Sequence, residues 1–296
     1  MSNDLQAPFD VAVVMVTIVR PTLAQALQSI YAQRFAGRIQ VLIGIDRWEG
    51  ARATVDQLVA QRPSHVAVTI VDLGYSTSQR NGGLYPSAYG GGLKTMLSYA
   101  ANSRYVTYLD DDNWYATEHL ATLLAAAAGK DWAFSLRYFV DAPTGELLCP
   151  DTWESLGPDR GVYAAAQGGF VDTNCYLIDK LACYDVFPEW AMTRHAGGTG
   201  GDRQILQRIK GRAWGTNGAH TLYYRQNLVG HHPYLLWRFR CAGVDLARYM
   251  PPAAIPGEAV WRECAEFDRQ NSANAAPGES AGISGAPATP STGGRA

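Results

Sequence analysis

YVTYLDDDN, residues 105–113, joins a short apolar run directly to three consecutive aspartates. The apolar part is rich in β-branched and aromatic side chains, which predicts a buried strand over 105–109. Three carboxylates at the end of such a strand bring several hard oxygen ligands to one point, which suits Mg²⁺ or Mn²⁺. The alternative is that the acids only begin a loop and cap the helix predicted from Thr117.

The segment before this cluster alternates predicted strands with predicted helices. The strands are expected at 11–19, 39–45 and 66–71, and the first is apolar and uninterrupted, as in a strand buried on both faces. Such alternation indicates a parallel, doubly wound sheet. Ligands of these sheets bind beyond the carboxyl ends of the strands, so Thr17, Asp46 and Asp110 are expected to face one crevice.

The second half of the chain is predicted to be less regular. Short β segments are expected at 133–140, 174–178 and 220–224, and helices at 117–128 and 202–210. The fold class is therefore α/β, with a mainly parallel central sheet flanked by helices and a mixed α+β second half. Residues 1–115 would form the first half of one domain, residues 116–270 its second half, and residues 271–296 a disordered tail with almost no large apolar side chain.

Composition and charge exclude several classes of protein. The net charge is −2 and no lysine-rich run occurs, so a nucleic-acid partner is not expected. Five cysteines without a CxxC pair favour neither a disulfide framework nor a zinc site, and fit a reducing cytoplasm. The polar, acidic start lacks the features of a signal peptide. The longest apolar runs are shorter than the roughly 20 residues that span a bilayer.

Three segments together resemble glycosyltransferase family 2. They are VVMVTIVR at 13–20, the predicted strand that ends at Asp46, and YLDDDN at 108–113, in matching order and spacing. The resemblance is close over the first half and weaker up to His232. It implies a GT-A fold, a DXD motif and inverting transfer from a nucleotide sugar. It also implies that residues 1–115 are the nucleotide-sugar-binding half of the domain and residues 116–270 its acceptor-binding and catalytic half. Many relatives carry Ala-Arg-Asn-x-Gly where this chain reads AYGGGLK, residues 88–94, so Arg80 or Lys94 would have to supply the charge.

The resemblance also implies roles for individual residues. The donor site would comprise Thr17, Val19, Arg20, Asp46, Lys94, Asp110 and Asp111. The metal, Mn²⁺ or Mg²⁺, would be held by Asp112 and Asp110, with Asp110 mainly toward the ribose, and by one histidine of the pair His231 and His232. Adjacent side chains diverge, so only one of these histidines is expected to reach the metal, and the sequence does not choose between them.

The catalytic base is expected in GGTGGDRQ, residues 197–204, where a flexible loop enters an amphipathic helix. Inverting relatives place a carboxylate here that takes the proton of the acceptor hydroxyl, which makes Asp202 the candidate. A helix N-cap is the alternative role of Asp202, because aspartate caps helices well. His195 is an alternative base, since its ordinary pKa lies near neutrality.

The function expected from these features is metal-dependent, inverting transfer of a sugar, preferably from a UDP-sugar, to a hydroxyl of a saccharide, lipid-linked or other acceptor. The mixed segment 234–240 would allow peripheral contact with the inner face of a membrane, or would simply be a docked helix. Two other functions remain open. A sugar nucleotidyltransferase of this fold should carry a basic, glycine-rich loop after the first strand. A nucleotide-sugar or glycan-binding protein would tolerate loss of Asp202.

Overall fold

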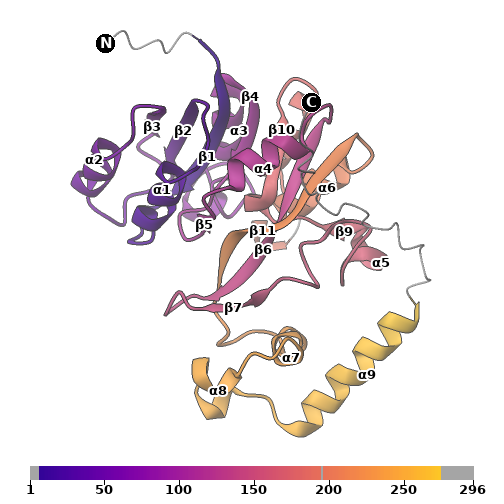
Figure 1. Ribbon diagram of the computed structural model, residues 1–296. Coiled ribbons are helices and arrows are strands. Elements are labelled where there is room, and N and C mark those ends of the chain that lie inside the picture. Colours follow the sequence, from indigo (N-terminus) through magenta and orange to yellow (C-terminus); the bar gives the residue numbers. More distant parts are fainter. Residues whose placement is uncertain (1–6, 195, 275–296) are drawn as a thin grey trace, which may run out of the picture.

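The computed structural model describes residues 7–194 and 196–274. A nine-stranded mixed sheet forms its centre. The strands are β1 (Phe9–Thr17), β2 (Ile39–Ile45), β3 (Val66–Asp72), β4 (Ser103–Tyr108), β5 (Trp114–Tyr115), β6 (Trp132–Asp141), β7 (Leu147–Pro150), β10 (Tyr176–Asp179) and β11 (Trp214–Gln226). They follow the order β3-β2-β1-β4-β10-β6-β11-β5, and β7 pairs with β6 (Figure 1).

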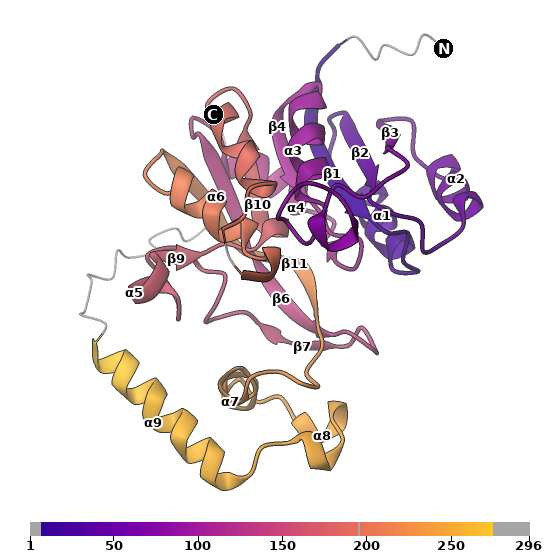
Figure 2. The same cartoon turned by 180° about the vertical axis from the view of Figure 1, so that it is seen from behind.

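Helices lie on both faces of this sheet, and the last three helices of the chain are set apart from it (Figure 2). They are α1 (Leu23–Tyr31), α2 (Arg52–Ala60), α3 (Gly91–Ala100), α4 (His119–Ala126), α5 (Ala164–Gln167), α6 (Gly201–Ile209), α7 (Pro233–Cys241), α8 (Leu246–Tyr249) and α9 (Glu258–Asn274). Two short 3-10 helices matter below, η2 (Thr173–Cys175) and η3 (Tyr184–Trp190). A separate pair of strands, β8 (Gly157–Pro158) and β9 (Gly169–Phe170), lies beside α5.

The first four strands form a parallel sheet, as the alternation of strands and helices predicts. β2 lies between β3 and β1, and β1 pairs with β4 on its other side, always in parallel. Right-handed crossovers place α1 and α2 on one face and α3, which connects β3 to β4, on the other. Because the chain reverses its winding direction between β1 and β4, the carboxyl ends of these strands border a crevice.

The second half is mixed, also as predicted. β6 and β11 are longer than their sequence pattern suggests, whereas β10 is shorter than the predicted segment 174–178, because η2 occupies its first residues. β10 is antiparallel to both β4 and β6, whereas β11 runs parallel to β6. The sequence predicts only 220–224 of the 13-residue β11. Glycine and asparagine interrupt the apolar pattern in its first part, and the register shifts there, so pairing with β6 rather than local propensity extends the strand.

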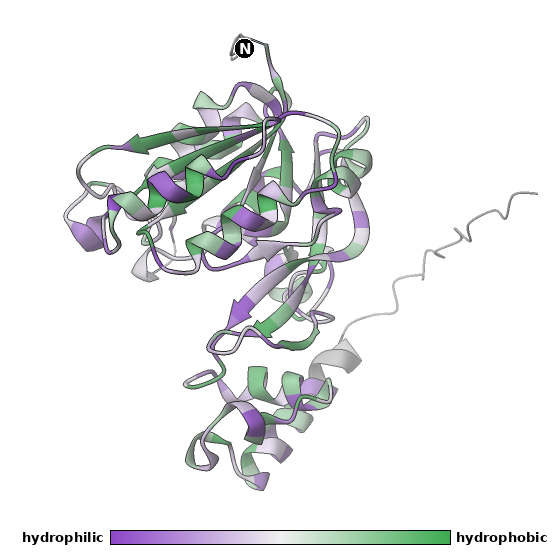
Figure 3. Cartoon of the chain, turned by 60° about the vertical axis from the view of Figure 1, so that its left-hand side comes forward, coloured by the Kyte–Doolittle hydropathy of each residue, from purple (hydrophilic) through white to green (hydrophobic). Residues whose placement is uncertain are grey.

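Two hydrophobic cores support the molecule. The main core lies on both faces of the sheet, and a second core joins the far ends of β6, β7 and β11 to α7–α9. Figure 3 shows these terminal helices set apart from the apolar strands of the main body. α9 continues to Asn274, past the boundary at 270 that composition predicts, because helix propagation needs no large side chains. The rest of the predicted tail, 275–296, lies outside the described residues.

α7 contains the whole segment 234–240, for which membrane contact and docking are the two interpretations. Its Leu236 and Phe239 are buried, and Arg238 forms an ion pair of 2.8 Å with Asp268 of α9. The segment is therefore a docked helix, covered by α9 on its apolar side. In the part of the chain that the structure describes, no helix is both long and apolar enough to span a membrane.

Candidate active site

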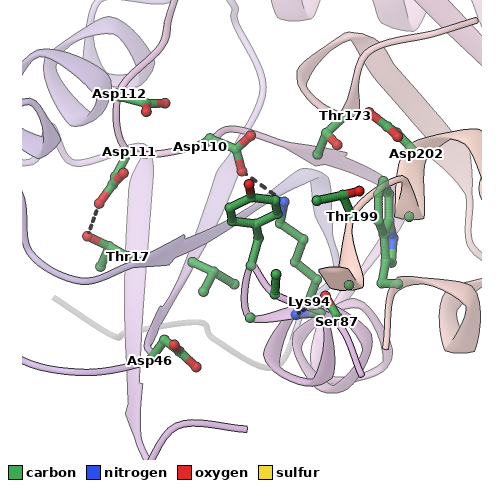
Figure 4. A pocket seen from close by; sticks show the side chains of 18 of the residues that line it. Thr17, Asp46, Ser87, Lys94, Asp110, Asp111, Asp112, Thr173, Thr199 and Asp202 are labelled. Atoms are coloured by element: carbon green, nitrogen blue, oxygen red, sulfur yellow. Dashed lines mark hydrogen bonds and ion pairs between the residues drawn. The ribbon is translucent and has the colours of Figure 1, made fainter. Parts of the chain in front are cut away.

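A cleft of about 720 Å³ opens at the carboxyl ends of β1, β2 and β4. Thr17, Asp46 and Asp110 all line it, which confirms that the three strand ends face one crevice. Figure 4 shows the aspartate cluster along one side and Asp202, with two threonines, on the other. Both halves of the chain thus contribute to a single site.

The loop after β1 is tied to the aspartate cluster through Thr17. The Thr17 hydroxyl donates to Oδ2 of Asp111 at 2.5 Å and accepts from the amide of Val19 at 2.7 Å. Val19 has φ 65°, a conformation that β-branched residues rarely adopt. Its side chain is buried, and it is not among the residues that line the cleft. Val19 therefore shapes the loop, while Thr17 and Arg20 face the cleft.

Asp110 is held from two sides. Lys94 Nζ lies 2.8 Å from Oδ1, and Asn174 Nδ2 donates to Oδ2 at 3.2 Å. The amide of Asp110 donates in turn to Oδ1 of Asn174 at 2.5 Å. Burial opposes ionisation of Asp110, but the charge and hydrogen bond of Lys94, the hydrogen bond of Asn174 and the charge of Arg20 together keep its pKa below the ordinary value. This carboxylate is therefore charged and has a fixed direction.

Asp112 is the more exposed acid of the cluster. Arg20 Nη1 lies 2.6 Å from its Oδ2 and 3.5 Å from Asp111 Oδ1. Burial, together with the charges of Asp110 and Asp111, raises the pKa of Asp112 to about 6. None of the three acids caps α4, whose N-cap is Glu118 without a side-chain hydrogen bond. The capping alternative for the cluster is therefore wrong.

The donor set fits a divalent cation shared with a diphosphate. Asp110 and Asp112 both line the cleft and offer carboxylate oxygens, and the raised pKa of Asp112 reflects negative charge that a cation would relieve. Among the described residues, no three His, Cys, Asp or Glu side chains converge as a complete ligand set. Mg²⁺-type sites commonly use one or two carboxylates and complete their shell with phosphate oxygens and water.

The two histidines stay outside this site. His232 is the N-cap of α7, where its Nδ1 accepts from the amide of Tyr234 at 3.3 Å. His231 contacts the side chain of Gln226 at the end of β11. Neither histidine lines the cleft, although Arg225 beside Gln226 does. The structure therefore does not bring either histidine to Asp110 or Asp112.

Asp46 and the glycine-rich segment form the far side of the donor half. The Ser76 hydroxyl lies 2.9 and 3.0 Å from the two carboxylate oxygens of Asp46, and the amide of Thr77 donates at 3.3 Å. Gly90 is the N-cap of α3 with φ 64°, and Lys94 follows on that helix. Lys94 thus supplies the charge at the aspartates, and Arg80 lines the cleft separately.

Asp202 is the second residue of α6 and lines the cleft from the other half of the chain. The N-cap is Gly200, so the capping alternative for Asp202 is wrong. Its Oδ1 accepts a local hydrogen bond from the amide of Arg203, at 2.8 Å. Burial, followed by the charge of Asp172, raises the pKa of Asp202 to about 6. His195, the alternative base, lies outside the described residues.

Comparison with known proteins identifies the architecture. No family model and no curated protein matches the sequence. Solved structures match most of the chain. One is S. aureus TarS, with a TM-score of 0.53 and 12% identity, and the match covers 88% of this chain and 43% of TarS. Another is TarS 1–349 in complex with UDP-GlcNAc, with a TM-score of 0.52 and 11% identity, and the match covers 86% of this chain and 71% of that one. A third is the mannosyltransferase PcManGT from Pyrobaculum calidifontis in complex with GDP-Man and Mn²⁺. Its TM-score is 0.51 at 13% identity, and the match covers 89% of this chain and 70% of that one. The chain has the GT-A fold.

At these identities the likeness shows the fold alone. The chain also spans less than half the length of the first TarS structure. Within this GT-A fold, the predicted residues Thr17, Arg20, Asp46, Lys94, Asp202 and the three cluster acids share one cleft. The sequence missed Asp172, which lines the cleft and bonds Asn174 and the buried Arg137. An acid directly before η2, in the stretch 172–174, is the only local signal that points to it.

Proposed function

We propose that the chain is a metal-dependent, inverting glycosyltransferase that uses a nucleotide-diphosphate sugar, with UDP as the preferred nucleotide. The observation that carries the proposal is the shared cleft, with the aspartate cluster on one side and Asp202 on the other. Inversion needs a base on the face of the sugar opposite the leaving group. Acids on two sides of one cleft meet that need.

In the proposed reaction the acceptor oxygen attacks the anomeric carbon while Asp202 takes the hydroxyl proton. The bond from that carbon to the phosphate oxygen breaks, and its electron pair leaves with the nucleoside diphosphate. Asp110 and Asp112 would hold the cation that neutralises charge on this leaving group. Asp202 suits the role of base, because a pKa of about 6 combines basicity with ionisation at neutral pH.

The donor half would bind the nucleotide through Thr17, Arg20, Asp46 and Lys94. Val19 would act indirectly by holding the strained loop. Solved structures of this fold carry UDP-GlcNAc in one case and GDP-Man with Mn²⁺ in another. The acceptor, a hydroxyl of a saccharide or of a lipid-linked molecule, would enter past Asp202.

Calorimetric titration tests the proposal with UDP, GDP and dTDP, each with and without Mn²⁺. We expect binding of one nucleotide to depend on Mn²⁺ and to weaken at least tenfold in Asp112→Ala, because one of two carboxylate ligands is lost. Asp185→Ala is the control, since it removes an acid that pairs with Arg212 outside the cleft. Absence of binding for all three nucleotides would refute the proposal.

A further inference from the structure

Arg137 is the centre of a buried ionic cluster that the proposed reaction does not use. Its guanidinium lies 2.9 Å from Asp151, 2.5 Å from Glu154 and 2.6 Å from Asp172, and only 2% of its side chain is exposed. One cation faces three carboxylates, so the cluster is unbalanced. Buried ion pairs give little net stability because desolvation offsets their attraction. The cluster therefore calls for a role other than stability.

Asp172 is the member of this cluster that reaches the cleft. Its Oδ2 accepts from Nη1 of Arg137, and its Oδ1 accepts from both the amide and Nδ2 of Asn174, at 2.9 and 2.7 Å. The amide of Asp172 is itself bonded to the Ser155 hydroxyl at 2.9 Å. With bonds on both oxygens, the carboxylate has one orientation.

Asn174 connects Asp172 to Asp110 on the donor side of the cleft. Its Nδ2 donates to Asp110 as well as to Asp172, and its Oδ1 accepts from the amide of Asp110. An unbroken chain of bonds thus runs from Arg137 on β6, through η2, to the acid that follows β4. Hydrogen bonds from outer groups commonly orient metal-binding carboxylates.

Asp172, which precedes η2, and Asp202 of α6 line the same cleft, so the two carboxylates face one space. After burial, the negative charge of Asp172 is the largest influence that raises the pKa of Asp202. Arg203 on α6 and Lys94 on α3 are the charged groups that oppose this effect. The same carboxylate therefore influences both the donor-side acid and the candidate base.

We propose that Asp172 is a positioning residue, oriented by the buried guanidinium, that couples the carboxylate of Asp110 to the candidate base Asp202. In the proposed reaction, on which this inference rests, Asp172 would act through Asp110 and Asp202. Through Asn174 it fixes the direction in which Asp110 presents its oxygens. Through its charge it keeps Asp202 basic enough to take a proton near neutral pH.

Asp172→Asn is the test, with Asp151→Asn as its matched control. Both substitutions remove one charge from the same cluster and keep the side-chain volume. Asp151 also bonds Arg137 and the amides of 153–155, but it does not line the cleft. Both variants should therefore lose similar thermal stability. Only Asp172→Asn replaces a carboxylate that accepts two bonds from Asn174, and only this substitution removes a negative charge that acts on Asp202.

Two readouts separate the variants. In the metal-free protein, a ¹³C NMR titration follows the carboxyl signal of Asp202, which is assigned because it is absent from Asp202→Asn. The titration midpoint of this signal should lie near pH 6. Asp172→Asn should move this midpoint to a clearly lower pH, whereas Asp151→Asn should not. Binding of Mn²⁺ and UDP should weaken about 10- to 100-fold in Asp172→Asn only.

Equal midpoints and equal affinities in the two variants would overturn the inference. If Asp172→Asn does not fold, Asn174→Ala tests the same link. It removes the side-chain bonds of Asn174 to Asp110 and to Asp172 but keeps the three ion pairs of Arg137. It should weaken nucleotide binding without moving the Asp202 midpoint, and unchanged binding would count against the coupling. If the unsubstituted protein binds no nucleotide, the proposed function is refuted. The titration midpoints of Asp202 in the two variants would still test whether Asp172 influences Asp202.

Discussion

Asp202 must be ionised to act as a base, so its pKa sets the acid limit of the proposed reaction. With a pKa of about 6, the active carboxylate form dominates above that pH and is lost below it. We expect the turnover of a UDP-sugar to fall roughly tenfold per pH unit below about 6. A pH profile of donor hydrolysis or transfer, measured from pH 4.5 to 8.5, checks this. A profile that stays flat down to pH 5 would assign the base to another group.

The raised pKa of Asp202 also has a consequence for stability. The folded state holds this proton more tightly than the unfolded state, so ionisation at neutral pH costs folding free energy. Asp202→Asn removes that cost and should stabilise the protein at pH 8 by about 1 kcal/mol, with little effect near pH 4. Thermal melting of both proteins at the two pH values measures the difference. An equal Tm change at both pH values would contradict it.

The loop before α6 depends on a glycine that no other residue can replace. Gly198 has φ 73°, and an added Cβ would lie 2.1 Å from the Pro86 carbonyl oxygen. Its own carbonyl accepts from the amide of Ala88 at 2.7 Å, which joins this loop to the glycine-rich segment before α3. Gly198→Ala should therefore separate the two loops, reduce turnover more than tenfold and lower stability by about 2 kcal/mol.

Gly197→Ala is the matched control for this contact. Gly197 has nearly the same φ, 76°, but an added Cβ would meet no atom within 4 Å. Both variants carry the strain of alanine at positive φ, about 1 kcal/mol. Only in Gly198→Ala does the added Cβ clash with a backbone atom. Steady-state kinetics and melting curves of the pair separate the two effects. Equal losses in both variants would show that backbone strain alone matters.

Local sequence patterns predict the strands that carry the donor site better than the groups that orient them. The apolar runs place the end of β2 correctly, that of β4 within one residue and that of β1 two residues too late, so the acids at 46 and 110 could be assigned to strand ends. The contacts of Asp172 join residues separated by up to 35 positions, and no periodicity encodes such pairs. For His231 and His232 the residue type predicted a metal ligand, but the structure places both side chains outside the cleft that contains the acids.

The two hydrophobic cores divide the molecule into a part that forms the cleft and a part that does not. Phe187 and Phe239 are both buried, one in each core. Changing either to alanine should cost about 3–5 kcal/mol. η3 carries Phe187 and the cleft residue Trp190, whereas among the described residues no part of α7–α9 lines the cleft. Phe187→Ala should therefore weaken nucleotide binding severalfold, and Phe239→Ala should change it less than twofold.

Melting curves and calorimetric titration with UDP and Mn²⁺, performed on both variants, test this division. The two substitutions remove the same side chain from equally buried sites, so a difference in affinity cannot come from the size of the cavity. Loss of nucleotide binding in Phe239→Ala would mean that the terminal helices hold the cleft in shape through β6 and β11. Their core would then belong to the active site rather than to the stability of the terminal helices alone.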